Sequence, residues 1–127
     1  MDPFQVHSNL FKTLSHPVRL AVLAILRDGE QCVCHIEAKL GLRQAYISQQ
    51  LSVLKSAGII EDRREGWNIF YQVSNPEIYK FLDQAGEISG ESFPFWSSNT
   101  QSSECPCPKC NLLKEMIVSA EQVVAKQ

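Results

Sequence analysis

The sequence has no long apolar run, and no part of it approaches the ~18 consecutive apolar residues that a membrane-spanning helix needs. Its first residues, MDPFQVHSNLFK, also lack the basic flank and the continuous apolar segment of a signal peptide. We therefore expect a cytoplasmic protein with no membrane partner. Disorder of the whole chain is excluded, because 44% of its 127 residues are apolar and 20% are charged.

An excess of positive charge is absent as well. The net charge of -2 argues against a protein that coats nucleic acid indiscriminately. The basic share is nevertheless concentrated in the first part of the chain: residues 1–75 hold eight Lys and Arg against seven Asp and Glu, and residues 76–127 hold four against seven. Any contact with nucleic acid is therefore expected to be local, within the first part.

Patterns typical of a catalytic site are also missing. No Ser/His/Asp arrangement and no pair of carboxylates is apparent, and the C-x-x-C spacing of Cys107 and Cys110 is not surrounded by a βαβ pattern. We expect neither an enzyme nor an organic cofactor. The five cysteines are an odd number, and in a cytoplasmic protein they favour metal ligation or redox chemistry over structural disulfides.

The chain divides into residues 1–90, which read as one domain that binds DNA and dimerises, and residues 91–127, which read as a linker, a cysteine-rich metal-binding tail and a terminal helix. Apolar spacing predicts helices over about 4–14, 18–26, 34–40 and 43–57, then a β-hairpin with strands over 59–63 and 68–73, and a fifth helix opened by Asn75-Pro76-Glu77. Two short helices joined at Gly41 and followed by a hairpin predict a winged helix-turn-helix, a mainly α fold with a β-hairpin (α+β).

The helix over 43–57 is the candidate recognition helix. When Ile47, Leu51 and Leu54 face inward, the outward face carries small hydrogen-bonding side chains and no acidic residue, which suits a major groove. The alternative is a solvated helix face with no partner. The candidate DNA-binding residues are Ala45, Ser48, Gln49 and Ser52 on this face, Gln44, Tyr46 and Gln50 on its flanks, Arg43 and Lys55 at its ends, and Arg63, Arg64 and Trp67 on the hairpin.

Cys32-Val33-Cys34 places two thiols at positions i and i+2. On a regular helix these side chains would point about 200° apart, whereas in an extended segment they lie on the same side. One ion can therefore be shared only if the segment is extended or the first turn of the following helix is distorted. Taken alone, two such cysteines also fit small buried apolar side chains. His35 is expected to be a solvated group or a neighbour of the ligands, and His16 a capping residue before Pro17.

The tail adds Cys105, Cys107 and Cys110, which are separated by prolines. A linker of about 14 residues spans at most roughly 45 Å at ~3.3 Å per residue, so tail thiols can reach those of the domain in the same or the partner subunit. Two domain thiolates with one or two tail thiolates would form a trigonal or tetrahedral sulfur site for cadmium, lead, mercury or trivalent arsenic, with zinc also possible. The alternative is a disordered tail with adventitious thiols.

The runs LSHPVRLAVLAIL and QCVCHIEAKLGLRQAYISQQLSVLKSAGIIEDRREGWNIFYQV resemble the ArsR/SmtB family of metal-responsive transcriptional repressors over about residues 10–75. The resemblance implies a homodimer whose first and last core helices form the interface, and which leaves a pseudo-palindromic operator when an inducer binds. It also implies a thiolate site at Cys32 and Cys34, because arsenic, cadmium and lead sensors of the family use Cys-Val-Cys there.

This sequence departs from the family at three places. Arg43 stands where a serine cap is common, and Gln50 where a histidine is common, so the operator sequence does not carry over. The family's second metal site uses histidines and carboxylates on the last core helix. Residues 76–90 hold carboxylates but no histidine, and we therefore expect no zinc or nickel site there.

Two alternatives remain open. The same fold could sense oxidants or persulfides through a bond between Cys32 or Cys34 and a tail cysteine. The terminal helix could instead make the chain a protein-binding module, through the apolar stripe of Leu113, Met116, Ile117, Ala120 and Val124. Packing of that stripe on the protein's own dimer is the simpler explanation.

Overall fold

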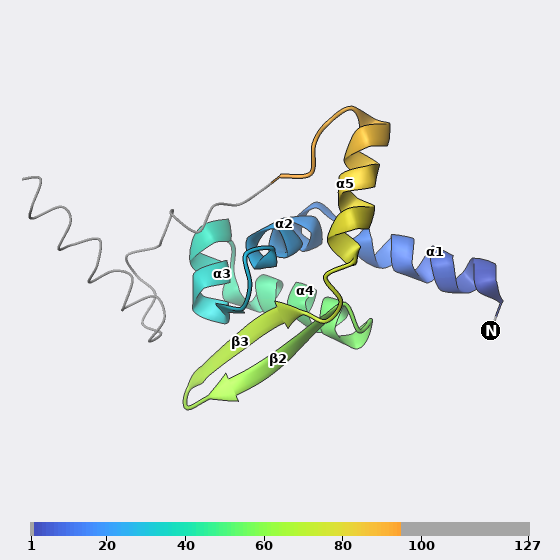
Figure 1. Ribbon diagram of the computed structural model, residues 1–127. Coiled ribbons are helices and arrows are strands. Elements are labelled where there is room, and N and C mark those ends of the chain that lie inside the picture. The colour runs from blue at the N-terminus through green and yellow to red at the C-terminus, as the bar shows by residue number, and fades with distance from the viewer. Residues whose placement is uncertain (1, 95–127) are drawn as a thin grey trace, which may run out of the picture.

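The computed structural model describes residues 2–94; the predicted cysteine tail and terminal helix lie outside these residues. The described part contains five helices and a three-stranded antiparallel sheet in the order β1-β3-β2, with the β2-β3 hairpin projecting from the helical body (Figure 1). The elements are α1 (Pro3–Leu14), α2 (Pro17–Leu26), β1 (Gln31–Cys32), α3 (Val33–Leu40), α4 (Gln44–Ser56), β2 (Ile60–Glu65), β3 (Asn68–Val73) and α5 (Ile78–Ser89). This confirms the predicted winged helix-turn-helix.

The junction between α1 and α2 follows from local chemistry. Pro17 occupies the first helical position of α2, where its missing N–H leaves no hydrogen bond unmade. His16 precedes it in an extended conformation, and its Nδ1 accepts a hydrogen bond from the backbone N–H of Val18 at 3.2 Å. The predicted capping role of His16 is therefore confirmed.

Glycines define the helix-turn-helix. Gly41 ends α3 in the left-handed conformation, with φ of 65°, and Gly58 follows α4 with φ of 76°. Arg43 precedes α4 as its N-cap but makes no side-chain capping hydrogen bond. The two helices therefore meet at the predicted turn, and the N-terminal end of α4 lies at the surface.

The hairpin has a two-residue turn at Gly66 and Trp67, and its register pairs Ile60 with Val73 at one end and Glu65 with Asn68 at the other. Strand β1 is not predicted from the sequence. This strand of two residues precedes α3 and pairs with β3, so it joins the cysteine segment to the wing.

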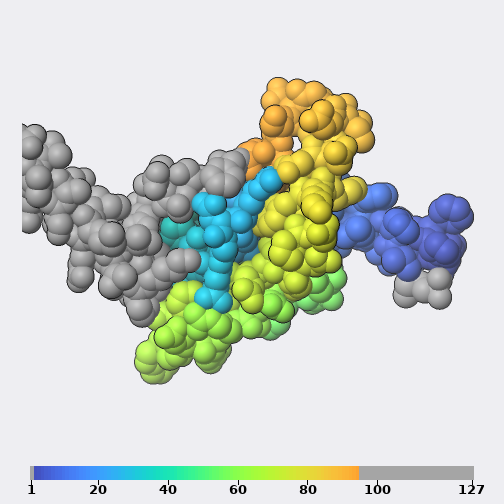
Figure 2. All heavy atoms as spheres, in the orientation of Figure 1, coloured from blue at the N-terminus to red at the C-terminus, as the bar shows by residue number. Residues whose placement is uncertain are grey.

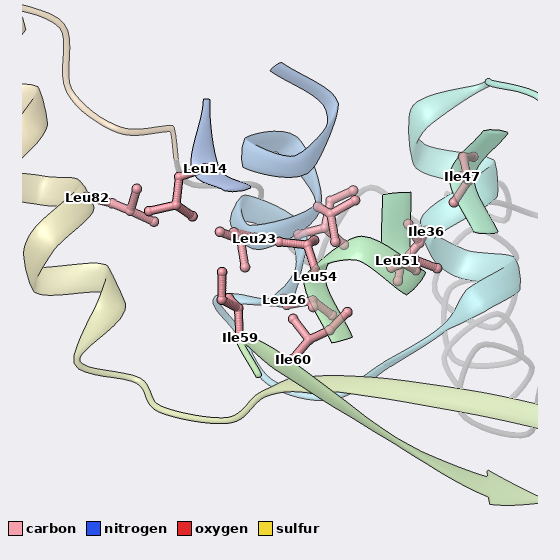
Figure 3. Close-up of a cluster of buried hydrophobic side chains, with 12 residues drawn as sticks. Leu14, Leu23, Leu26, Ile36, Ile47, Leu51, Leu54, Ile59, Ile60 and Leu82 are labelled. Carbon is pink, nitrogen blue, oxygen red and sulfur yellow. The ribbon is translucent and has the colours of Figure 1, made fainter. Parts of the chain in front are cut away.

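The core lies where α2, α3, α4 and α5 meet the base of the hairpin (Figure 3). Ile47, Leu51 and Leu54 are fully buried, which confirms the predicted inward face of α4. Each such side chain contributes about 1.5–3 kcal/mol through burial, and together they fix the rotation of α4 about its axis.

None of the helices within residues 2–94 has the length and apolar content that a membrane span requires.

Candidate functional site

The outward face of α4 is open. Gln44, Ala45, Ser48, Gln49 and Ser52 are all exposed, as the helical spacing predicts. Leu42, Arg43, Ala45, Tyr46 and Gln49 line an open hollow at the N-terminal end of the helix. No acidic side chain lies on this part of α4, so nothing there repels a phosphate backbone.

Tyr46 lies at the edge of this face and contacts α2. Its hydroxyl is 3.2 Å from Nε2 of His16, the same histidine that caps α2 through Nδ1. His16 therefore joins the start of α2 to the exposed face of α4, and it fixes the position of the Tyr46 ring beside the hollow.

Gln50 does not belong to the exposed face, which corrects the expectation that it flanks the DNA-binding residues. Its side chain is 5% exposed, and its Oε1 accepts a hydrogen bond from Nε of Arg19 at 2.8 Å. Arg19 also donates to the carbonyl oxygen of Thr13 at 3.0 Å. Gln50 therefore connects α4 with α2 and the end of α1, and we remove it from the DNA-binding set.

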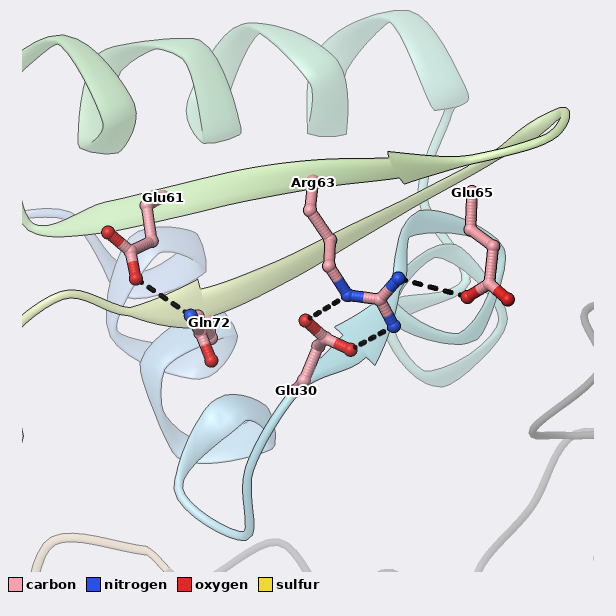
Figure 4. A network of polar contacts seen from close by, with 5 residues as sticks. All are labelled: Glu30, Glu61, Arg63, Glu65 and Gln72. Carbon is pink, nitrogen blue, oxygen red and sulfur yellow. Dashed lines mark hydrogen bonds and ion pairs between the residues drawn. The ribbon is translucent and has the colours of Figure 1, made fainter.

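The two arginines of the wing point in opposite directions. Arg63 donates to both carboxylate oxygens of Glu30, at 2.7 and 2.8 Å, and to Glu65 at 2.9 Å (Figure 4). The hydrogen bonds to Glu30, and then to Glu65, raise the pKa of the guanidinium above its already high value. Because successive residues of a strand face opposite sides, Arg64 points away from this cluster. Arg63 is therefore bound by Glu30 and Glu65 within the protein, and we leave it out of the proposed DNA-binding set.

Lys55 and Trp67 are two further candidate DNA-binding residues, one near the end of α4 and one at the hairpin tip. Lys55, near the end of α4, forms an exposed ion pair with Asp62 of β2 at 3.0 Å. Such pairs contribute about 0–1 kcal/mol, so a phosphate can compete for Lys55. Trp67 at the hairpin tip is 101% exposed, as expected, and nothing in the described chain covers its ring.

Cys32 and Cys34 form a close pair. Cys32 is the extended N-cap of α3, with φ of -76° and ψ of 154°, and its Sγ lies 2.9 Å from that of Cys34. The backbone N–H of His35 donates to Sγ of Cys32 at 3.3 Å, which favours the thiolate together with the positive end of the α3 dipole. The extended conformation that shared ligation requires is therefore present. Cys32 is 1% exposed and Cys34 half-buried.

His35 of α3 is buried, and Glu37 of the same helix is partly buried. His35 is 3% exposed, so the expectation of a solvated side chain is wrong, whereas the expectation of a neighbour of the ligands stays a prediction. Burial also raises the pKa of the Glu37 carboxyl, and its Oε1 has no hydrogen-bond partner among residues 2–94.

The sulfur pair is compatible with one soft ion but is incomplete by itself. At a Zn–S distance of ~2.3 Å, two sulfurs on a tetrahedral ion stand about 3.8 Å apart, so the thiols would separate by about 1 Å. A linear site would need roughly 4.6 Å. Residues 2–94 contain no group of three or more Cys, His, Asp or Glu side chains that could hold an ion. The predicted partners Cys105, Cys107 and Cys110 lie outside the described residues.

Large apolar side chains are exposed on α1 and α5. In Figure 2, α1 (blue) projects from the rest of the described chain beside α5 (yellow to orange). Phe11 of α1 stacks on Phe81 of α5 with ring centroids 5.9 Å apart, and both rings remain partly exposed. The exposed set on these two helices comprises Phe4, Val6, Leu10, Phe11, Phe81 and Ile88. An apolar patch of this kind is typical of a subunit interface.

The arsR family of bacterial regulatory proteins matches residues 16–62, which span the start of α2 through the helix-turn-helix. An uncharacterized HTH-type transcriptional regulator from Methanocaldococcus jannaschii is 39% identical over 88 residues, which are 66% of this chain and 99% of that protein. The chain belongs to the ArsR family. This membership confirms the resemblance found in the sequence, and it confirms a regulator rather than an enzyme.

Two further similar proteins extend the comparison. A biofilm growth-associated repressor from Agrobacterium fabrum is 45% identical over 74 residues, and the match covers 58% of this chain and 63% of that protein. The chain therefore spans less than two thirds of that repressor. The solution structure of a homodimeric winged helix-turn-helix DNA-binding domain from Mycobacterium bovis has a TM-score of 0.62 at 26% identity, over 68% of this chain and 81% of that one.

Proposed function

We propose that this ArsR-family chain is a homodimeric transcriptional repressor that binds operator DNA. The observation that carries the proposal is the exposed, acid-free face of α4 beside a wing whose tip residue, Trp67, is uncovered. Homodimerisation is supported by the apolar surface of α1 and α5, and by the homodimeric DNA-binding domain of similar fold.

The α4 face would read base edges and the flanking groups would contact the backbone. Glutamine can form two hydrogen bonds with an adenine edge, and an alanine methyl can contact a thymine methyl. The proposed DNA-binding set is Arg43, Gln44, Ala45, Tyr46, Ser48, Gln49, Ser52, Lys55, Arg64 and Trp67.

The proposed inducer is a soft thiophilic ion held by Cys32 and Cys34 with one or more of Cys105, Cys107 and Cys110. Support comes from the 2.9 Å sulfur pair at the start of α3, and from the family resemblance of Cys-Val-Cys. Sulfur ligands favour trivalent arsenic, cadmium, lead or mercury, with zinc possible on geometry. Release from DNA requires that the ion bind the conformation that cannot bind DNA more tightly than it binds the DNA-binding conformation.

The test uses an operator selected from a random DNA library by the reduced protein. Operator binding is measured by anisotropy with and without cadmium, trivalent arsenic and mercury, for three proteins: the full chain, Cys32→Ser/Cys34→Ser, and a chain lacking residues 104–127. We expect the double variant to keep operator affinity within about twofold and to lose release, because serine removes the thiolates and little volume. The shortened chain should hold cadmium poorly.

Release of the double variant by the same metal at the same concentration would show that the proposed thiolate site is wrong. Failure of the full chain to select any operator would overturn the proposal of DNA binding itself.

The 2.9 Å distance between the sulfurs also supports a second candidate, a thiol-based redox repressor. A peroxide would oxidise the Cys34 thiol to a sulfenic acid with release of water. The Cys32 thiol would then form the S–S bond and release a second water, so that two thiols are oxidised and one peroxide is reduced. This pairing differs from the expected bond to a tail cysteine.

Two measurements distinguish the candidates. Metal binding to fully reduced protein produces near-ultraviolet thiolate-to-metal absorption without any oxidant. Oxidation instead lowers the mass by two hydrogens per subunit and links Cys32 with Cys34 in one tryptic peptide. Release of the operator by peroxide in chelator-treated protein, and not by metal, would favour the redox candidate.

A further inference from the structure

One rung of the three-stranded sheet connects the thiol pair with the wing. Cys32 of β1 lies opposite Phe70 of β3, and Phe70 lies opposite Arg63 of β2. Residues opposite one another in a sheet point to the same face, so the three side chains form a row. Cys32 and Phe70 are buried in one cluster, and the guanidinium of Arg63 lies 4.5 Å from the centroid of the Phe70 ring.

A second connection links the segment that carries Cys32 directly to β2. Glu30 immediately precedes β1, two residues before Cys32, and its carboxylate binds Arg63 through two hydrogen bonds of 2.7 and 2.8 Å (Figure 4). A bidentate pair fixes orientation as well as distance, since both nitrogens of the guanidinium fork are engaged. The backbone that carries the thiol is therefore bound to β2 both through β3 and directly through Glu30.

We propose that the Glu30–Arg63 pair is a positioning element that transmits occupancy of the thiol site to the wing. The inference rests on the proposed function, because it concerns how binding at Cys32 changes affinity for DNA. The pair acts by holding β2 against the segment that carries Cys32.

The expected motion follows from the sulfur geometry. One shared ion requires the two sulfurs to move apart by about 1 Å from their 2.9 Å separation. Cys32 and Phe70 are packed together and are only 1% and 3% exposed, so displacement of the Cys32 side chain or backbone displaces the ring. Arg63 then follows through its contact with the ring and its bond to Glu30, and the hairpin changes its angle to α4.

The test compares Glu30→Gln with Glu61→Gln. Both substitutions remove one carboxylate charge from the same side of the sheet. Glu61 is a matched control because its carboxylate accepts a hydrogen bond from Gln72 across the hairpin rather than from Arg63 (Figure 4). The quantity measured is the release ratio, defined as the operator Kd with saturating cadmium divided by the operator Kd without metal.

We expect Glu30→Gln to bind cadmium with the same stoichiometry and thiolate absorption as the full chain, and to keep its metal-free operator Kd within threefold. Its release ratio should fall to less than a third of the unsubstituted value, whereas Glu61→Gln should keep the full ratio. Arg63→Gln should lower the release ratio equally. The double variant Glu30→Gln/Arg63→Gln should have the same release ratio as either single variant, because all three proteins lack the same ion pair.

An unchanged release ratio in Glu30→Gln, or losses that multiply in the double variant, would overturn this proposal while leaving the proposed function intact. Absence of cadmium release in the unsubstituted chain would instead contradict the proposed function.

Trp67 provides a readout that does not depend on DNA. In a Trp96→Phe background, Trp67 at the wing tip is the remaining tryptophan. Cadmium should change its emission in the otherwise unsubstituted protein and in Glu61→Gln, and should change it much less in Glu30→Gln. An equal change in all three would contradict transmission through the pair.

Discussion

Gln49 and Gln50 are adjacent residues with identical side chains and different environments. Gln49 is exposed on α4, whereas Gln50 is 5% exposed and bound to Arg19. We predict that Gln49→Ala weakens binding to the selected operator by roughly 1–3 kcal/mol, the usual effect of a lost base contact. Competition anisotropy on the operator and on random DNA checks this. An equal loss on random DNA would assign Gln49 to the phosphate backbone.

Gln50→Ala is predicted to lower the stability of the fold, whereas Gln49→Ala is predicted to lower the affinity for DNA. Gln50→Ala removes the acceptor of a partly buried, charged donor, so the free energy of unfolding should fall by about 1.5–3 kcal/mol. Urea denaturation of the reduced protein measures it. Gln49→Ala is the control, and its free energy of unfolding should stay within about 0.5 kcal/mol of the parent. Equal stability of the two variants would contradict the role assigned to the Arg19–Gln50 bond.

The sequence allowed part of this distinction to be predicted. The apolar period correctly placed Ile47, Leu51 and Leu54 in the core and Gln49 outside. It could not place Gln50, because the partner that buries it, Arg19, comes from α2 and lies 31 residues away. A polar residue beside an apolar stripe is assigned correctly only when its long-range partner is known.

Among the elements, the wing contains two adjacent arginines, Arg63 and Arg64, that have different environments. Arg64 is exposed and points away from the Glu30 cluster, whereas Arg63 is bound within it. We predict that Arg64→Gln weakens binding to all DNA sequences and reduces the slope of log K against log salt by about 1, as for one lost phosphate contact. Arg63→Gln should leave that slope unchanged. Binding isotherms at several salt concentrations measure both, and equal slopes for the two variants would contradict the assignment.

Element boundaries followed closely from local signals. The proline at 17, the glycines at 41 and 58 and the turn at 66 defined helix and hairpin ends, because each imposes a backbone conformation within a few residues. Strand β1 could not be predicted in this way. It has two residues, and its partners Phe70 and Tyr71 are nearly 40 positions later. Its existence nevertheless determines where Cys32 lies.

At the scale of the whole molecule, the uncovered faces of α1 and α5 predict dimerisation. We predict that the protein sediments as a dimer at micromolar concentration and that Ile88→Asp shifts it toward monomer. Ile88 is 88% exposed in the single chain, so a charge there costs the subunit fold little but would be buried in the interface. Trp67→Asp, at an equally exposed apolar position, should remain dimeric. A monomeric parent, or a dimeric Ile88→Asp variant, would contradict this interface.

We propose that one event, binding of a soft ion by the thiolates of Cys32 and Cys34, causes release from DNA. The most direct measurement titrates cadmium into reduced protein bound to fluorescent operator while recording anisotropy and thiolate-to-cadmium absorption in the same sample. We predict that the two signals change together and level off at the same number of cadmium equivalents per subunit. Absorption that reaches its plateau while the operator stays bound would contradict it.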